Sequence, residues 1–392
     1  MQTNCKLGHN IDWEAVMNYK KKLLSLLTIG ALSCGVWACG SSENVTDQDN
    51  GKLNVVCISF PEYDWARQVI GEENENVQLS LIVDNGMDIH NYQPSADDMI
   101  EISNSDLCIY NGGTSEEWVE EAAAGGNQVK TVNVMELLET EVVEEELVEG
   151  MQEETTHVHG KEETANAHED VDVHSKDVHS EEKDSEAHNK EVHNEEETEH
   201  THEEVEEHVH EAEEAEYDEH VWLSLKNAIK AVNAIQTEVS TLDEENAILY
   251  QENASAYVKE LEALNQKYAI MVQESKRNVL LFGDRFPFRY LTDDYGLTYY
   301  AAFPGCSAET EASFETIVFL AEKVKENQLP CILTIDGSDQ AIAQSVKTST
   351  GDNNVKILTL NSLQSVSKEK LEETTYLSVM EENLQVIKEA LD

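Results

Sequence analysis

Short apolar runs alternate with helical patterns over two separate parts of the chain. The runs lie at residues 53–60, 77–83, 106–113 and 128–134 in the first part, and at 278–284, 297–303, 331–336 and 355–360 in the second. Apolar runs of this length, rich in β-branched residues and separated by helices, are typical of buried strands in a parallel sheet. The pattern predicts an α/β fold with two similar lobes. Each lobe is expected to hold a four-stranded, mainly parallel sheet with flanking helices.

Long helical patterns separate the two lobes. A first one begins near Trp222, and a second runs from Glu244 to about Glu274 with apolar residues three or four positions apart. Thirty-one helical residues would span about 46 Å at 1.5 Å per residue. That length exceeds what one small lobe needs, so we expect a rigid helix that joins both lobes. Two α/β lobes commonly meet at a cleft, and ligands bind there near the carboxyl ends of strands.

Residues 136–219 interrupt the alternation of strands and helices. This segment has 34 acidic residues and four lysines, about 30 of the chain's 54 net negative charges. Its apolar content is too low to offset the conformational entropy of an ordered chain, so we expect a disordered or loosely helical loop. A chain this acidic is not expected to bind nucleic acid, because phosphate binding needs a basic face. The charge favours cations instead.

The N-terminus has the features of a targeting signal. Three lysines at 20–22 precede the apolar run LLSLLTIGALSCGVWAC, which is too short and interrupted for a membrane span. The following VWAC-GSS resembles a bacterial lipobox, with Cys39 as the lipidated residue and Cys34 as the alternative. Met17 is the expected true start. A secretory signal removed without lipidation is the other interpretation.

The cysteines of the expected mature chain indicate no cysteine-rich metal site or redox motif. They are Cys57, Cys108, Cys306 and Cys331, and no two of them form a CxxC pair. Those at 57, 108 and 331 lie in strand-like runs, where a small buried residue is expected. A disulfide between Cys306 and Cys331 stays open at this point.

Two histidines stand outside both the signal and the acidic loop. His90, in GMDIHNYQPS, follows a predicted strand and precedes a helix, which places it at the carboxyl end of the sheet. His220, in DEHVWLSL, directly precedes the helical region. A single histidine is more often a surface or core residue than a ligand, so spacing alone does not decide their role.

The surroundings of these histidines resemble a known family. GMDIHNYQPSADDMIEISNSDLCIYNGG is similar to the first ligand segment of the zinc- and manganese-binding proteins of ABC importers, and DEHVWLSLKNA is similar to the second. The resemblance extends from about Leu53 to the C-terminus and includes a His-rich acidic insertion. It implies two lobes joined by a rigid helix, with one divalent ion in the interlobe cleft held by His90 and His220.

The second lobe departs from the family's pattern. Where the family often has a third histidine ligand, LLFGDRFPFRYL places Gly283 or Arg285, and Asp284 is the nearest side chain that could coordinate. Zinc accepts a carboxylate oxygen, but a salt bridge from Asp284 to a neighbouring arginine is the alternative. Asn361 falls at the family's last ligand position. Glu309 is expected to act as a helix-cap acid.

The acidic loop carries 11 of the 14 histidines. Paired ones, in HVH and HTH, are the expected accessory metal ligands: His157, His159, His200, His202, His208 and His210. Histidines dispersed in low-complexity acidic sequence favour metal binding, and the acids would attract the ion. Nearby acids tend to raise histidine pKa, so protons should compete with the metal as pH falls. A solvated charge run that happens to contain histidine is the alternative.

The resemblance implies an extracytoplasmic, lipid-anchored zinc-binding component of an ABC importer. Its expected partners are the membrane permease with its ATPase, and a monomer is expected. The alternatives are a manganese- or iron-binding protein on the same scaffold, or a surface adhesion or zinc-storage lipoprotein. A zinc hydrolase would need a general base and an open metal position, and HExxH, GxSxG and P-loop motifs are absent from the sequence. The chain is therefore not expected to be an enzyme.

These expectations divide the chain into seven parts. They are a gene-model extension at 1–16, a lipoprotein signal peptide at 17–39, a flexible tether at 40–51, an N-terminal lobe at 52–135, the His-rich loop at 136–219, linking helices at 220–276 and a C-terminal lobe at 277–392.

Overall fold

A computed structural model describes residues 51–71, 74–126, 128–152, 216–307 and 311–392. The expected lipidation site Cys39, all six paired histidines of the acidic loop, and Glu309 lie outside these ranges. Gly51–Asp392 forms one compact unit. Within the described residues, no helix combines the length and the hydropathy that crossing a membrane would require.

The first lobe is built on a four-stranded parallel sheet with the order β2-β1-β3-β4. Its strands are β1 (Leu53–Cys57), β2 (Val77–Leu81), β3 (Leu107–Tyr110) and β4 (Lys130–Asn133). The helices α2 (Phe60–Ile70), α3 (Ala96–Ser103), α4 (Glu117–Gly125) and α5 (Val134–Leu138) connect or follow them. β3 is central and wholly buried, which explains its continuous apolar sequence LCIY.

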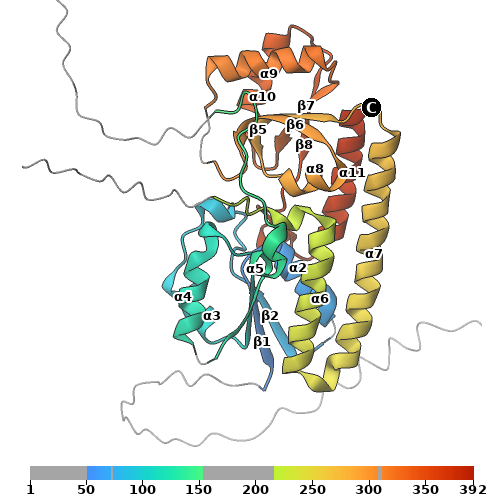
Figure 1. Ribbon diagram of the computed structural model, residues 1–392. Coiled ribbons are helices and arrows are strands. Elements are labelled where there is room, and N and C mark those ends of the chain that lie inside the picture. The colour runs from blue at the N-terminus through green and yellow to red at the C-terminus, as the bar shows by residue number, and fades with distance from the viewer. Residues whose placement is uncertain (1–50, 72–73, 127, 153–215, 308–310) are drawn as a thin grey trace, which may run out of the picture. The chain divides into compact units, whose positions relative to one another are not determined.

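The second lobe repeats this plan with the order β6-β5-β7-β8 (Figure 1). Its strands are β5 (Val279–Phe286), β6 (Thr298–Pro304), β7 (Cys331–Ile335) and β8 (Lys356–Leu360), and all are paired in parallel. The helices are α8 (Arg289–Tyr295), α9 (Phe314–Glu326), α10 (Ala341–Thr350) and α11 (Tyr376–Leu391). The predicted fold class is confirmed: two four-stranded parallel sheets with flanking helices.

Two helices link the lobes, α6 (Leu225–Leu242) and α7 (Ala247–Glu274). The 28 residues of α7 span about 42 Å at 1.5 Å per residue. A 3₁₀ turn at Glu244–Asn246 replaces the first turn of the predicted 31-residue helix. At its start Asn253 donates to the carbonyl of Val69 in the first lobe, and near its end the Tyr268 hydroxyl donates to the carbonyl of Met380 in the second. The helix therefore contacts both lobes, as Figure 1 also shows.

The two ends of the predicted disordered loop are structured, which corrects the boundaries 136–219. Residues 136–152 and 216–219 are placed, and an antiparallel bridge joins Glu144 to Tyr217. Val142, Val143 and Met151 pack against the main hydrophobic core. The charge count concealed these apolar residues, which bury enough surface to order both ends of the segment.

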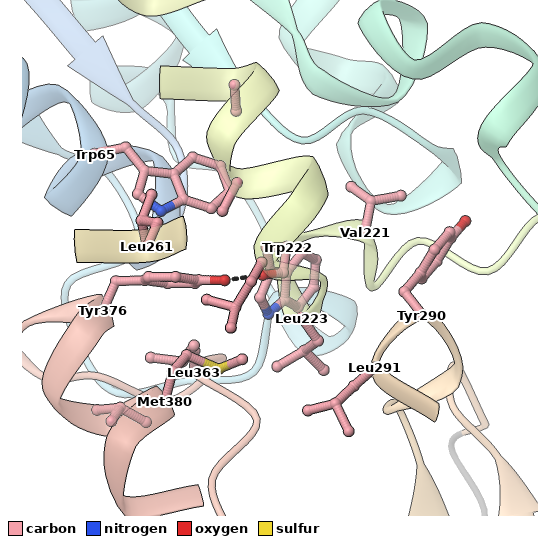
Figure 2. Close-up of a cluster of buried hydrophobic side chains, with 14 of the residues drawn as sticks. Trp65, Val221, Trp222, Leu223, Leu261, Tyr290, Leu291, Leu363, Tyr376 and Met380 are labelled. Atoms are coloured by element: carbon pink, nitrogen blue, oxygen red, sulfur yellow. Dashed lines mark hydrogen bonds between the residues drawn. The ribbon is translucent and has the colours of Figure 1, made fainter. Parts of the chain in front are cut away.

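A shared apolar cluster lies where segments from both lobes meet (Figure 2). The short 3₁₀ helix η4 (Val221–Leu223) is at its centre and is completely buried. The hydroxyl of Tyr376 donates to the carbonyl of Trp222 at 2.7 Å, and the indole of Trp222 donates to the carbonyl of Ser362 at 2.9 Å. The residue just before η4 is therefore held at a fixed place between the lobes.

Candidate metal site

His90 lies in the 3₁₀ helix η1 (Ile89–Asn91), beyond the carboxyl end of β2. The Asp88 carboxylate caps this turn by accepting the backbone N–H of His90 at 3.1 Å. Ile89 is buried in the first lobe's core, which fixes the turn and directs the neighbouring imidazole. The His90 side chain is 9% exposed. Local capping and one buried apolar anchor thus position this histidine.

His220 is completely buried and directly precedes η4. Asp218 Oδ1 accepts both the backbone N–H of His220 and its Nδ1–H, each at 2.9 Å. A carboxylate on Nδ1 fixes the ring's orientation and its tautomer. Nε2 of His220 therefore carries the ring's lone pair, which is directed at the site.

The two imidazoles meet through Nε2 atoms 3.1 Å apart. Because His220 keeps its proton on Nδ1, the hydrogen-bond network assigns the shared proton to Nε2 of His90. Two nitrogen ligands of a tetrahedral zinc ion lie roughly 3.4 Å apart, given bonds of about 2.0–2.1 Å. An ion can therefore replace the shared proton with a movement of a few tenths of an ångström. The ligand geometry is nearly formed in advance.

A second layer of polar groups supports His90. Ser115 Oγ lies 2.8 Å from Nδ1, and Glu219 Oε2 lies 3.6 Å from the same atom. When Nε2 binds an ion, Nδ1 carries the ring's proton and can donate it to either group. Burial, followed by the charge on His220, lowers the pKa of His90 to about 4, although Asp88 and Glu219 oppose the shift. His90 is therefore neutral near pH 7, the form that binds metals.

Cys306 is the third donor beside the histidines. One ligand atom each from His90, His220 and Cys306 lies within 4.8 Å of the others, a group that could hold a metal ion. Cys306 follows β6 by two residues, so it too lies at the carboxyl end of a strand. Burial, with the Glu145 carboxylate next, raises the pKa of its thiol, so the metal-free thiol keeps its proton.

Gly305 lets the backbone before Cys306 approach the histidine. A Cβ at this position would lie 2.8 Å from Cε1 of His220 and 3.0 Å from its Nδ1, closer than real side chains pack. On the other side, Oε1 of Glu145 accepts the backbone N–H of Cys306 at 3.0 Å. Glu145 belongs to the structured first end of the acidic loop. The base of that loop therefore holds the segment that carries the thiol.

Gln364 reaches the histidine pair from the second lobe. Its Nε2 lies 3.2 Å from Nε2 of His220 and 3.4 Å from Oδ1 of Asp88. The side chain is buried, and no described residue forms a hydrogen bond with its Oε1. An unpaired buried carbonyl oxygen costs free energy unless something binds it. The amide therefore brings an unused oxygen donor close to the histidines.

Asp284 lies apart from this group. Its two carboxylate oxygens accept the backbone N–H of Arg285 at 2.9 Å and that of Ile335 at 3.2 Å. It lines a cavity of about 520 Å³, together with Asp88 of the first lobe and the residues that follow β7 in the second. The group of His90, His220 and Cys306 does not include it. As a metal ligand Asp284 remains a prediction.

Two further positions from the sequence analysis have structural roles. The guanidinium of Arg285 pairs with the carboxylate of Asp88, across the lobes. Asn361 Oδ1 accepts the backbone N–H of Leu363 at 2.8 Å, which makes it a local turn residue. The side chain that approaches His220 is Gln364, three residues later.

A family model described as "Zinc-uptake complex component A periplasmic" matches residues 55–390. The chain belongs to this family. The expected zinc-type importer family is therefore confirmed, on a match that covers both lobes and the residues of the candidate site.

Individual members of the family are distant relatives of this chain. The zinc-binding lipoprotein AdcA of Streptococcus pneumoniae is 28% identical over 377 residues, which are 95% of this chain and 61% of AdcA. The high-affinity zinc uptake system protein ZnuA of Bacillus subtilis is 25% identical over 374 residues, 95% of this chain and 98% of that protein. This chain thus spans less than two thirds of AdcA.

Solved structures agree on the fold. The crystal structure of the Zn(II)-bound ZnuA-like domain of Streptococcus pneumoniae AdcA matches with a TM-score of 0.58 and 24% identity, over 87% of this chain and 100% of that domain. The crystal structure described as the metal-dependent lipoprotein YcdH from Bacillus subtilis gives a TM-score of 0.59 at 20% identity, over 87% of this chain and 100% of the other.

Sequence reasoning selected two residues that the structure brings together and missed two others. His90 and His220 are 130 positions apart and in contact. Cys306 had a signal, because PGC follows a predicted strand at the end where ligands bind. A disulfide with Cys331 was the role considered, but both cysteines are free. Gln364 has no such signal, because the family resemblance puts the last ligand position at Asn361.

Proposed function

We propose that this chain is the extracytoplasmic zinc-capturing component of an ABC importer, with His90 and His220 as ligands of one Zn²⁺ between the lobes. The observation that carries the proposal is the pair of Nε2 atoms 3.1 Å apart, each ring oriented through its Nδ1. Buried imidazole nitrogens in this arrangement suit zinc. Family membership supports zinc as the cargo.

A lipid on Cys39 would hold the chain at the outer face of the membrane, where the permease and its ATPase receive the ion. The relative AdcA is named a lipoprotein, which supports this location. The chain works as a monomer and catalyses no reaction. Zinc is the transported substrate.

The acidic loop would collect zinc near the membrane or sense its excess. The accessory ligands are the paired histidines, with His157, His159 and His208 among them. The loop would bind several ions more weakly than the cleft binds one, because wrapping a chain around an ion costs conformational entropy. Its structured base includes Glu145, which contacts the Cys306 backbone. This contact connects the loop to the proposed site.

A competition titration with zinc tests the cleft assignment. The soluble chain from Asn44 is compared with a form in which a short linker replaces residues 153–215. One tight zinc site in both forms, lost in the His90→Ala/His220→Ala double variant, is the expected result. Retention of that site by the double variant, or its loss on loop deletion alone, would contradict the proposal. The second outcome would identify the protein as a loop-based metal buffer.

A further inference from the structure

We propose that the Cys306 thiolate and the Gln364 side-chain oxygen complete a four-donor site with His90 and His220, which makes the site select thiophilic Zn²⁺ over Mn²⁺. This inference rests on the proposed function, because it concerns the same ion between the same histidines. It departs from the ligands that the family resemblance implies for the second lobe. There, Gly283 or Arg285 stands at the third ligand position and Asn361 at the last.

The position of Cys306 supports its role as a ligand. Its sulfur is within 4.8 Å of a ligand nitrogen of each histidine. Two features bring it there: Gly305, where any Cβ would collide with His220, and Glu145, which accepts the Cys306 N–H at 3.0 Å. A zinc–sulfur bond is about 2.3 Å long and a zinc–nitrogen bond about 2.0–2.1 Å, so the sulfur and the nitrogens would move closer together when all three bind one ion.

Gln364 supplies the independent observation. The residue is 7% exposed, and its buried Oε1 has no hydrogen-bond partner within the described part of the chain. The amide lies against the histidine pair, with Nε2 at 3.2 Å from Nε2 of His220. Without an ion this group donates to the histidine. A rotation of the amide about its last bond would bring the unused oxygen to the same place.

Each carboxylate around the site already accepts at least one hydrogen bond or ion pair, whereas the oxygen of Gln364 accepts none from the described residues. Asp218 accepts from His220, and Asp88 pairs with Arg285 and caps η1. Glu219 Oε1 accepts the Thr114 hydroxyl at 2.8 Å and the Ser115 N–H at 3.0 Å. Asp218 Oδ1 and Glu219 Oε1 would have to give up these partners to reach the ion. The oxygen of Gln364 would gain its first.

This donor set favours soft or borderline metals. Zinc binding would break the S–H bond of Cys306 and form a Zn–S bond, with the proton released to solvent and no change of oxidation state. One thiolate, two imidazoles and one amide oxygen give a tetrahedral, sulfur-containing site, which is a zinc environment. Manganese prefers carboxylate, carbonyl and water oxygens in octahedral geometry. Selection against Mn²⁺ then follows from sulfur and from the low coordination number.

Cobalt(II) is the probe that tests the sulfur, because a Co–thiolate bond gives a near-ultraviolet charge-transfer band that nitrogen and oxygen ligands do not. The chain from Asn44 has four cysteines, and residues 153–215 have none, so loop-bound cobalt adds no such band. The matched variants are Cys306→Ser and Cys331→Ser, since Cys331 is a free, buried cysteine inside β7.

The proposal predicts a charge-transfer band in the parent chain and in Cys331→Ser, and no band in Cys306→Ser. Zinc affinity should fall about 100-fold or more in Cys306→Ser, since even the groups that support ligands change affinity 10- to 100-fold. The preference for zinc over manganese should fall with it. Bound zinc should also slow alkylation of Cys306 in the parent chain, and no longer do so in the His90→Ala/His220→Ala variant.

The amide ligand is tested separately with Gln364→Leu and Gln364→Glu. The leucine variant should bind zinc more weakly, and the glutamate variant should recover tight binding and accept manganese better. Equal zinc affinity in Gln364→Leu and the parent chain would overturn the role of Gln364. Cobalt bound through His90 and His220 without a sulfur band would overturn the role of Cys306 and leave the proposed function standing. Unchanged zinc affinity in the His90→Ala/His220→Ala variant would refute the proposed function itself.

Discussion

At the scale of single residues, the proposed metal site depends on groups that are not proposed ligands. Asp218 and Ser115 orient the two imidazoles, and Gly305 leaves the space that His220 fills. The ligands and the residues that hold them are far apart in the sequence but neighbours at the carboxyl ends of strands. Mutations in this supporting set should change zinc affinity more than they change stability.

Gly305→Ala should weaken zinc binding at least about tenfold, the effect typical of a disturbed supporting group. The new methyl group would lie 2.8 Å from Cε1 of His220, so the ring must move away from His90. The matched control is Gly125→Ala, where a Cβ meets nothing within 4 Å at the end of α4. Competition titration compares the two variants. Equal zinc affinity in both would show that Gly305 does not position the site.

A buried carboxyl pair in the first lobe should make stability depend on pH. Burial raises the pKa of Glu62 to about 7, while Ser59 donates a hydrogen bond that opposes the shift. Burial, with the charge on Glu62 next, also raises the pKa of Glu116. Among the residues that the structure describes, Oε1 of each carboxyl group lacks a hydrogen-bond partner. These groups favour the folded state when protonated.

The sign of the effect follows from the raised pKa. The folded-state pKa of Glu62 exceeds the unfolded value of 4.5, so its contribution is fully present below pH 4.5 and is lost as pH rises through about 7. Glu62→Gln cannot ionise. Its free energy of unfolding relative to the parent should therefore rise by about 3 kcal/mol between pH 4.5 and pH 8. Denaturant unfolding measures this difference, and a constant difference across that range would contradict the prediction.

At the scale of elements, η4 and the C-terminal helix α11 hold His220 in place. Tyr376, the first residue of α11, donates its hydroxyl to Trp222 inside η4, as the dashed line in Figure 2 shows. Its backbone N–H donates to Asp64 of α2 at 2.7 Å. A similar buried bond joins Tyr268 of α7 to Met380. The two tyrosines therefore offer equivalent changes at different distances from the histidine.

Tyr376→Phe and Tyr268→Phe should each lower the free energy of unfolding by about 1–3 kcal/mol, because each leaves a buried carbonyl without its donor. Only Tyr376→Phe should also weaken zinc binding, since it loosens the turn that follows His220. Chemical denaturation and competition titration measure the two effects. Equal losses of zinc affinity in both variants would mean that the effect is general destabilisation.

The sequence predicted the elements well for a physical reason. Strands such as LCIY and CILTI are buried on both faces, so their apolar runs are continuous and easy to locate. Charge dominated the pattern at 136–152, where Val142, Val143 and Met151 pack on the core. Average composition hides a few apolar residues in a charged segment, so it does not predict that residues 136–152 pack on the core.

The site was harder to predict than the elements. His90 and His220 stood out because histidine is rare outside the loop. Cys306 and Gln364 do not stand out in the sequence in this way, since a cysteine or glutamine after a strand is common. Their role depends on which strand ends converge and on where an amide oxygen lies unpaired. Both depend on three-dimensional packing, which periodicity does not encode.

At the scale of the whole molecule, the proposed metal ligands come from both lobes and from the segment between them. His90 follows β2 of the first lobe, Cys306 follows β6 of the second, and His220 precedes the helices that join them. Contacts between the lobes already exist: Arg285 pairs with Asp88, and Arg67 of α2 donates to the carbonyls of Leu371 and Thr374. Zinc would add a further link between two units that are already in contact.

Zinc should therefore stabilise the loop-deleted chain as one unit. At free zinc 100 times above the dissociation constant, the free energy of unfolding should rise by about 2.7 kcal/mol. Amide hydrogen exchange should slow around His90 in the first lobe and around Cys306 in the second. The His90→Ala/His220→Ala variant is the control and should show neither change. Protection confined to one lobe would contradict a site shared between them.

Anomalous diffraction at the zinc edge tests the central claim most directly. Crystals of the loop-deleted chain with one equivalent of zinc should give one strong anomalous peak within bonding distance of Nε2 of both His90 and His220. The Cys306 sulfur and the Gln364 oxygen should complete the coordination. A principal peak elsewhere, with the two histidines still hydrogen-bonded to each other, would contradict the claim that this pair captures zinc.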